Sequence, residues 1–174
     1  ADGTMINLFR HNGEWILATR GGIGARNKWD DTMSFYDMFQ ECAQIDYEAL
    51  DKTCSYSFVM KHTANRVVSP VSYNELYLVE MYRYSTDPTV PPERLLVKDF
   101  PPSSFHKVET FDPTEDDNMS FYDLSKDLPY YCKGFTVKRG SHRTNTINPN
   151  YRYVQDLKPN TNSPYLNYLE LRQN

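Results

Sequence analysis

The sequence contains little cysteine and no long apolar run, and each shortage excludes a class of protein. The three cysteines, Cys42, Cys54 and Cys132, are odd in number and widely spaced. This fits neither a disulfide framework nor a pair of zinc ligands. No stretch approaches the roughly 20 apolar residues that cross a membrane, and no signal-peptide pattern leads the chain. We therefore expect a protein of a reducing, intracellular compartment that is not secreted and has no membrane partner.

The sequence also lacks an excess of positive charge. Lysine and arginine number 19 against 23 aspartates and glutamates, which gives a net charge of −4. A negative chain gains nothing from bulk electrostatics near nucleic acid, so any phosphate binding must come from local clusters of Lys and Arg. The 174 residues, 39% of them hydrophobic and 14% aromatic, are enough for one compact domain with its own core.

The first clear pattern is a hairpin followed by a glycine-rich loop. The alternating runs "MINLFR" and "EWILAT" flank Asn12-Gly13, a pair that favours a tight turn between two strands. The next letters, "RGGIGARNK", combine three glycines with Arg20, Arg26 and Lys28. Such a loop is either an ordinary surface loop or a phosphate-binding loop, in which glycine allows close approach of the backbone.

A helical pattern follows this loop. Phe35, Met38, Phe39 and Cys42 recur at helical intervals, which predicts an amphipathic helix with these four residues on one buried face. The pentapeptide Met-Ser-Phe-Tyr-Asp at 33–37 recurs at 119–123, and we interpret both copies as the same helix-start chemistry rather than as a domain repeat. The candidate caps for the first helix are Asp30, Asp31, Thr32 and Ser34.

Two β-rich segments come next, and a proline-rich stretch follows them. The segments "CSYSFVMKHTANRVVSP" (54–70) and "ELYLVEMYRY" (75–84) predict a pair of sheet strands. Prolines scattered through residues 85–118 exclude a continuous helix or a central strand. We interpret 85–118 as a connector that contains one short helix near residues 93–97.

The last third of the chain holds its densest positive segment. A strand pair that turns at Gly140-Ser141, followed by a helix from Pro149, is the economical prediction for it. The segment is either a solvated face or, with neighbouring Tyr and Phe as stacking surfaces, a contact for nucleic acid or nucleotide. The final "SPYLNYLELRQN" is either a closing strand or an arm that binds a neighbour. No acid interrupts the run of basic residues Lys133, Lys138, Arg139, His142 and Arg143.

The order of these segments resembles the nucleotidyltransferase domain of ATP-dependent RNA ligases, particularly the small ligase-like proteins of phages and large DNA viruses. The letters "DGT" after Ala1 are similar to the end of motif I, Lys-x-Asp/Glu-Gly, and the segment with Phe58 and Asn65-Arg66 is similar to motif IIIa. "KGFTVK" and "RTNTINPNYRYVQDLK" stand where motifs IV and V are expected. The resemblance implies one α+β domain over residues 1–174, an antiparallel-sheet nucleotidyltransferase of the adenylation type that lacks the segment before motif I.

The resemblance also implies a set of catalytic groups, and most of them are replaced. Ligation needs a nucleophilic lysine, carboxylates that hold a metal ion, and lysines that neutralise phosphates. The lysine would directly precede Ala1, and a chain without an initial methionine leaves removal of an N-terminal segment open. Val59 stands where motif III has glutamate, and Lys133 stands where motif IV has glutamate. Motif V offers Asn145 and Ile147 where Lys-x-Lys is expected, and neither can replace an ammonium group.

These replacements predict a domain that kept the ligase fold and lost its chemistry, with no catalytic residue and no metal ligand. We expect it to bind nucleotide or RNA through six cationic residues. All of these except Arg139 are expected to converge on one concave surface. The six residues are Arg20, Lys28, Arg66, Lys138, Arg139 and Arg143.

Two alternatives stay open. An active ATP-dependent RNA ligase whose lysine lies just before Ala1 would need ATP and magnesium, whereas no cofactor is expected otherwise. A virion or assembly scaffold would have protein partners and no role with nucleic acid. The viral resemblance implies a location in the host cytoplasm or the virion.

Overall fold

A computed structural model of the chain describes residues 2–28, 32–101, 103–110, 120–140, 142–157 and 163–173. The chain divides into two compact units. The first, which we name the sheet unit, comprises Gly3–Arg66 and Val71–Thr110. The second, the hairpin unit, comprises Asp2, Val67–Pro70 and the residues after Thr110. Among the described helices, none is long and apolar enough to span a membrane.

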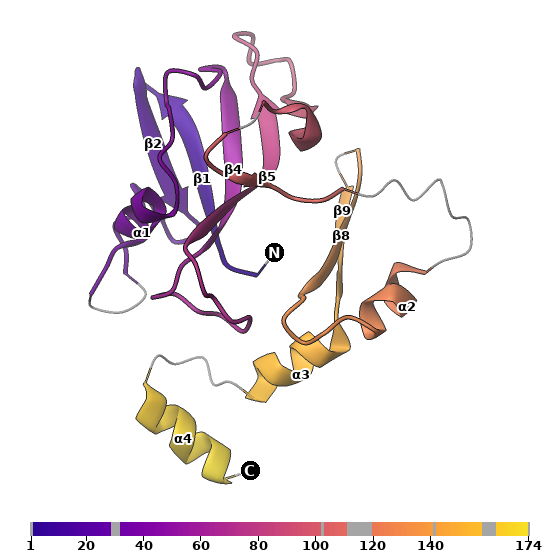
Figure 1. The fold of residues 1–174 in the computed structure, drawn as a ribbon. Helices are drawn as coiled ribbons and strands as arrows, with labels where there is room; N and C mark the ends of the chain where they lie inside the picture. The colour runs from indigo at the N-terminus through magenta and orange to yellow at the C-terminus, as the bar shows by residue number, and fades with distance from the viewer. Residues whose placement is uncertain are drawn as a thin grey trace. The chain divides into compact units, whose positions relative to one another are not determined.

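The sheet unit is built on one sheet with the strand order β3-β2-β1-β4-β5-β6, and β7 also pairs with β5 (Figure 1). The β5–β7 pair is parallel, and the other pairs are antiparallel. The predicted α+β class with a mainly antiparallel sheet is confirmed. The strands are β1 (Thr4–His11), β2 (Glu14–Thr19), β3 (Gly22–Ile23), β4 (Cys54–Lys61), β5 (Glu75–Arg83), β6 (Glu93–Leu95) and β7 (His106–Lys107).

The predicted first hairpin is confirmed. His11 at the end of β1 is opposite Glu14 at the start of β2, so the turn contains only two residues. Asn12 and Gly13 have φ angles of 49° and 85°. A two-residue turn with positive φ at both positions matches the right-handed twist of its strands, which explains why the Asn-Gly pair is a reliable local signal.

The paired strands β4 and β5 are also confirmed, but β5 contains a bulge that its sequence pattern did not indicate. Leu76 and Leu78 are buried, and strict alternation would bury Glu80 next. The register between β4 and β5 shifts at this point, so that Val79 is the extra residue on β5. Met81 is therefore buried in place of Glu80.

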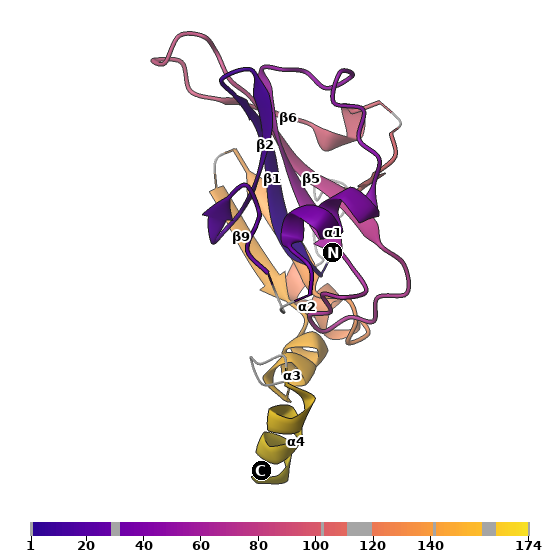
Figure 2. The ribbon, with the colours of Figure 1, turned by 90° about the vertical axis from the view of Figure 1, so that its left-hand side faces the viewer.

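The helix α1 (Phe35–Cys42) covers one face of this sheet (Figure 2). Phe35, Met38 and Phe39 are buried in the core, as predicted, and Cys42 is half-buried beside it. The Phe39 ring packs edge-on against Phe58 of β4, with 5.7 Å between ring centroids. Of the candidate caps, Ser34 is the N-cap, and Asp30 and Asp31 lie outside the described residues.

The short helix predicted near residues 93–97 is wrong. Residues Glu93–Leu95 form β6 at the edge of the sheet, and the 3₁₀ helix η1 (Val97–Asp99) follows. The open edge of β5 offers backbone partners to this segment. A helix of five residues would have to nucleate without such support. Residue 102 and residues 111–118 of the predicted connector lie outside the described residues.

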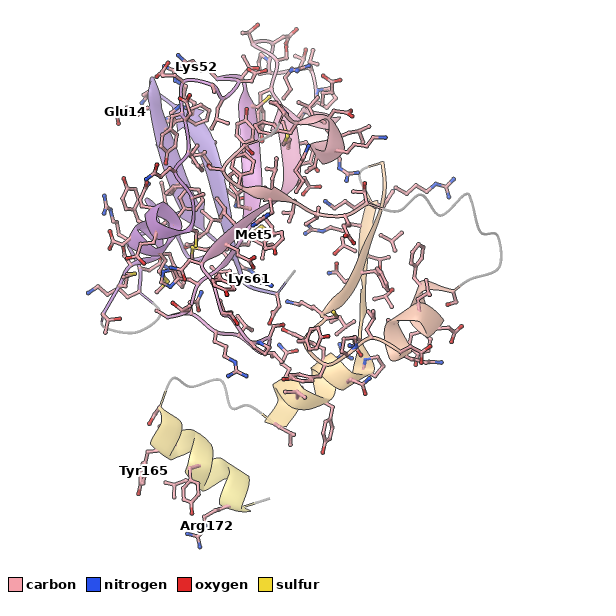
Figure 3. All side chains as sticks on the ribbon, viewed as in Figure 1. Met5, Glu14, Lys52, Lys61, Tyr165 and Arg172 are labelled. Carbon is pink, nitrogen blue, oxygen red and sulfur yellow. The ribbon has the colours of Figure 1, made fainter. Side chains whose placement is uncertain are left out.

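The hairpin unit contains β8 (Gly134–Arg139), β9 (His142–Ile147) and three helices: α2 (Phe121–Lys126), α3 (Pro149–Leu157) and α4 (Pro164–Gln173). The predicted strand pair and the helix from Pro149 are confirmed. The closing strand considered for the last residues is wrong, because this segment is the helix α4. Its Ser163 hydroxyl accepts a hydrogen bond from the Leu166 amide, and exposed Tyr165 and Arg172 project from it (Figure 3).

The repeated pentapeptide starts a helix in both units, as predicted. Ser34 Oγ accepts a hydrogen bond from the Asp37 amide at the start of α1. Ser120 Oγ accepts one from the Tyr122 amide at the start of α2. Each serine therefore satisfies an amide that the helix itself leaves without an acceptor.

Candidate functional site

Asp2, which the resemblance assigns to motif I, is buried in the hairpin unit with only 4% of its surface exposed. Its Oδ2 accepts hydrogen bonds from the backbone amides of Val68 (3.1 Å) and Ser69 (2.9 Å). Its Oδ1 accepts one from the Tyr151 hydroxyl on α3 (2.7 Å). Asp2 thus joins residues 67–70 to α3, and both of its oxygens are engaged in the fold.

The surroundings of Asp2 keep its carboxylate ionised. Burial alone would raise the pKa of Asp2, but the hydrogen bonds from Ser69, Tyr151 and Val68, together with the charge of Lys133, outweigh burial and lower that pKa. Burial and the hydrogen bond to Asp2 raise the pKa of Tyr151. The pair therefore consists of a charged acceptor and a neutral donor.

Lys133, at the position where the resemblance expects the glutamate of motif IV, points its ammonium at this carboxylate. Its Nζ lies 3.9 Å from Asp2 Oδ1 and 5.7 Å from the centre of the Tyr151 ring. Motif I and motif IV positions would both be acidic in an active ligase, according to the resemblance. Here they form an ion pair of opposite charges.

Two motif glycines are required by close backbone packing. Gly134 of motif IV has a φ of 122°, and a Cβ at this position would collide with the Thr146 carbonyl oxygen of β9. A Cβ at Gly3 of motif I would collide with the Met60 carbonyl oxygen of β4. Both glycines are therefore explained by the fold alone.

Two of the residues that the resemblance assigns to motif IIIa, Phe58 and Asn65, are buried in the sheet unit as well. Phe58 is fully buried in the core, between Phe39 and Phe105. Asn65 is 1% exposed, and its side-chain amide donates a hydrogen bond to Thr4 Oγ1. These residues tie strands together and do not present chemical groups to solvent.

The sequence analysis missed Asn148, which organises the hairpin unit. Its fully buried side-chain amide donates hydrogen bonds to the carbonyl oxygens of Leu128 (3.0 Å), Pro129 (2.9 Å) and Cys132 (2.9 Å). Its Oδ1 accepts one from the Asn150 amide at the start of α3. An Asn before Pro at a helix start is a capping signal that could have identified it.

The end of the β8–β9 hairpin brings together three of the six predicted binding residues. Lys138 of β8 is directly opposite Arg143 of β9, and Arg139 is directly opposite His142. All four belong to the last two residue pairs before the turn. Lys138 is half-buried, whereas the other three are exposed.

The motif V positions Asn145 and Ile147 lie further along β9. Asn145 is opposite Thr136, whose hydroxyl donates a hydrogen bond of 2.9 Å to Asn145 Oδ1, and Ile147 is opposite Gly134. An amide and an aliphatic side chain therefore occupy the strand positions where the resemblance expects two phosphate-binding lysines.

The glycine-rich loop of the sheet unit is fixed by its own hydrogen bonds. The Gly24 amide donates to the Leu17 carbonyl oxygen (2.6 Å), and the Gly21 amide donates to Thr19 Oγ1 (3.3 Å). Thr19 Oγ1 in turn donates to the side-chain oxygen of Asn27 (3.2 Å). Because the Gly24 and Gly21 amides already donate hydrogen bonds within the protein, the structure supports the interpretation as an ordinary surface loop rather than as a phosphate-binding loop.

The other three predicted residues lie in the sheet unit. Arg20 and Lys28 are exposed at the two ends of the glycine-rich loop, and Arg66 is exposed after β4. Since the six residues are divided between the two units, convergence on one concave surface stays a prediction. In the described part of the chain, no group of three His, Cys, Asp or Glu residues could hold a metal ion.

Comparison with known proteins gives two relatives, both viral, and no family model matches the chain. The chain is 26% identical over 187 aligned positions, covering 98% of its length, to an immediate-early protein ICP-46 homolog of Invertebrate iridescent virus 3. It is also 28% identical over 78 positions, which cover 39% of its length, to a protein of Autographa californica nuclear polyhedrosis virus. The name of that protein, bifunctional polynucleotide kinase/RNA ligase, is a provisional assignment. The chain spans 38% and 11% of the lengths of these relatives. It is thus weakly and partially similar to a viral RNA ligase.

Proposed function

We propose that this chain is an RNA-ligase-like nucleotidyltransferase domain that has lost ligase chemistry and binds nucleic acid. The partial similarity to a viral RNA ligase and the order of the motif-like segments support the family assignment. Positions that the resemblance assigns to motifs occur in both the hairpin unit and the sheet unit, so the proposed family assignment concerns both units.

The contact between Lys133 and Asp2 carries this proposal. A magnesium ion is bound by carboxylate and carbonyl oxygens together with phosphates. Asp2 already accepts three hydrogen bonds, and an ammonium lies 3.9 Å from its Oδ1. The ammonium of Lys133 would repel a magnesium ion bound at Asp2. This arrangement therefore opposes metal binding at the motif I and motif IV positions.

The retained motif residues differ in role from the replaced ones. Among the retained residues, Gly3, Gly134, Phe58 and Asn65 are each buried or needed for close packing, whereas Arg66 is exposed. The replaced positions are those to which the resemblance assigns chemistry. Groups that act as a unit in catalysis do not leave proportionate activity when several are lost, so we expect no residual ligation.

Local charge favours nucleic-acid binding for the remaining role. Residues 128–155 contain no Asp or Glu. Their five cations, Lys133, Lys138, Arg139, Arg143 and Arg152, give this stretch a charge of +5 within a chain of net charge −4. A concentrated basic segment is the electrostatic footprint of a polyanion partner.

Covalent self-adenylation tests the loss of chemistry. The chain is incubated with radiolabelled ATP and magnesium, alongside a version with one lysine added before Ala1 and the same version with Lys133→Glu. We expect no covalent label on the first two proteins, because the nucleophile, the carboxylates and the phosphate-binding lysines are all needed together.

The other outcomes are equally informative. Label on the chain itself would overturn the proposal. Label on the lysine-extended chain would support the active ligase instead and would make ATP and magnesium its cofactors. If the chain binds neither RNA nor DNA at low salt, the scaffold with protein partners becomes the better hypothesis.

A further inference from the structure

The tip of the β1–β2 hairpin presents an asparagine followed by a glycine to solvent. Asn12 and Gly13 are both exposed and form the whole turn between β1 and β2. Glu14, the next residue, marks this end of the sheet in Figure 3. Nowhere else in the sequence does glycine follow asparagine. Because glycine has no side chain, the backbone nitrogen of Gly13 lies next to the Asn12 side-chain amide without a Cβ to shield it.

We propose that Asn12 is a deamidation site, at which the chain releases ammonia and gains a carboxylate without any enzyme. The Gly13 nitrogen bonds to Cγ of Asn12 and closes a five-membered succinimide ring. The Asn12 side-chain nitrogen leaves as ammonia and takes with it the proton that the Gly13 nitrogen loses. Water then opens the ring at one of its two C–N bonds. Opening at the side-chain carbonyl gives aspartate, and opening at the main-chain carbonyl gives isoaspartate.

The surroundings of the turn leave room for this attack. Apart from its chain neighbours, no atom of the described residues lies within 4 Å of the position that a Cβ would take at Gly13. Arg10 Nε and Nη2 donate hydrogen bonds to the Gly13 carbonyl oxygen, at 3.2 and 3.0 Å. A permanent cation therefore lies at the residue whose nitrogen becomes negative as it attacks, which lowers the cost of that step. At Asn27, which is also exposed, the next residue is Lys28, so a side chain stands beside the corresponding nitrogen. Asn12 should therefore react faster than Asn27.

The sequence contains one Asp-Gly pair, Asp2-Gly3, which could form the same ring but is held in place by the fold. Asp2 is buried, and its two oxygens accept hydrogen bonds from backbone amides and a tyrosine hydroxyl. A Cβ at Gly3 would collide with the Met60 carbonyl oxygen, so the backbone has no room to turn toward the side chain. Loop tips, by contrast, are where local opening costs the least free energy. The hairpin tip therefore has an opening motion available that Asp2-Gly3 lacks.

The two products should act differently on the hairpin. Aspartate leaves the backbone unchanged, and Asp-Gly favours the same two-residue turn with positive φ at both positions as Asn-Gly does. Isoaspartate routes the backbone through the former side-chain carbonyl and so adds one atom to the turn. The register between β1 and β2 depends on the length of the turn. The isoaspartate form should therefore lose the pairing of His11 with Glu14 at the tip and keep that of Leu8 with Leu17 in the core.

Peptide mapping by mass spectrometry, on folded chain incubated in neutral and in mildly alkaline buffer, measures the conversion at each asparagine. Conversion at Asn12 should be roughly tenfold faster than at Asn27, because Gly13 lacks the side chain that Lys28 carries. The rate should rise with pH, since the attacking nitrogen must lose its proton. It should also be higher in urea than in buffer, because the folded turn must open before the ring can close.

Two variants at position 12 serve as matched controls. Asn12→Gly keeps a residue pair that suits a turn with positive φ at both positions, and no ammonia should come from its hairpin tip. Asn12→Asp reproduces the aspartate product without isoaspartate. Hydrogen exchange of β1 and β2 verifies that both variants keep the hairpin. The same measurement on the separated isoaspartate form should show faster exchange at the tip than in Asn12→Asp.

Faster conversion at Asn12 than at Asn27, with both aspartate and isoaspartate among the products, is the expected result. Conversion at Asn12 that is no faster than at Asn27 would overturn the proposal. Release of ammonia that is unchanged in Asn12→Gly would overturn it as well, because the ammonia would then come from another residue. Equal exchange in the isoaspartate form and in Asn12→Asp would overturn the proposed effect on the hairpin. Because the assay contains no nucleic acid, its result is independent of the proposed function.

Discussion

The two units of this chain are held together by different kinds of contact. The described core of the sheet unit is a cluster of apolar and aromatic side chains on one face of the sheet, including Ile6, Leu8, Met38 and Phe58. In the described part of the hairpin unit, polar groups occupy every buried position except that of Val68. These are Asp2, Ser69, Ser125 and Asn148, together with Tyr151, whose hydroxyl binds Asp2.

The difference determines how each unit responds to change. Apolar burial is non-directional and roughly proportional to area, so a core of this kind tolerates reshaping and is insensitive to pH. A buried hydrogen-bonded network depends on geometry and protonation, and each broken contact leaves a desolvated group without its partner. The hairpin unit should therefore be the more sensitive of the two to polar substitution and to acid.

The largest expected effect comes from Phe58→Ala in the sheet unit. Phe58 is fully buried and packs against two other rings, so its truncation removes apolar area and leaves a cavity that costs about 4 kcal/mol. Urea unfolding measures the loss of unfolding free energy. Hydrogen exchange of β4 and of β8 shows the loss in the sheet unit and in the hairpin unit, respectively. Phe9→Ala, at a half-buried position on neighbouring β1, is the control and should cost less than half as much. Equal costs would contradict the assignment of Phe58 to the core.

The second-largest expected effect is a loss of about 2 kcal/mol of unfolding free energy at pH 7 for Asp2→Asn in the hairpin unit. The variant loses charge-assisted hydrogen bonds and the partner of Lys133. The folded state lowers the pKa of Asp2, so its stabilisation is present above the unfolded value, about 3.9, and is lost as pH falls through the folded value.

The difference between wild type and Asp2→Asn should accordingly be constant from pH 7 to about 5 and shrink below about pH 4. Unfolding free energies measured across this range, with hydrogen exchange of α3 as the local probe, test this. The control is Asp156→Asn, which changes an exposed carboxylate on α3, the helix that carries Tyr151. It should leave the unfolding free energy nearly unchanged. A difference that persists below the folded pKa would mean that the charge of Asp2 is not what stabilises the unit.

The sequence predicts best where the signal is local. Asn12-Gly13 determines its own turn, and the spacing of Phe35, Met38 and Phe39 determines which face of α1 is buried. The bulge at Val79 cannot be predicted from a local pattern, because it depends on how β5 pairs with β4, a partner distant in sequence. The bulge shifts the alternation of buried residues so that Met81 is buried. The segment 93–97 was misassigned for the same reason, since the edge of β5 overrides its local preference.

The site was less predictable than the fold because its contacts are long-range. Asp2 and Tyr151 are 149 residues apart, and no periodicity relates them. The sequence shows a lysine at 133 where the resemblance expects a glutamate, but the pairing of Lys133 with Asp2 is visible only in the structure. Lys138 and Arg143, by contrast, were brought together by a local turn that the sequence indicates.

The smallest and most closely matched comparison uses the repeated pentapeptide. Ser34 is 5% exposed, accepts a hydrogen bond from the Asp37 amide (3.2 Å) and donates one to the Asp37 carboxylate (2.6 Å). Ser120 is exposed and accepts one hydrogen bond, from the Tyr122 amide (3.3 Å). We expect Ser34→Ala to cost about 1 kcal/mol, a typical value for loss of a helix cap, and Ser120→Ala about half of that.

Amide exchange at Asp37 and Tyr122 measures each cap where it acts, independently of whether the two units unfold together. Ser34→Thr and Ser120→Thr keep the hydroxyl and serve as controls, which should recover most of the loss. Equal effects at both positions would show that the letters alone set the strength of the cap. A larger effect at Ser34 would show that burial in the sheet unit adds to it, because an amide shielded from water cannot replace its lost acceptor with solvent.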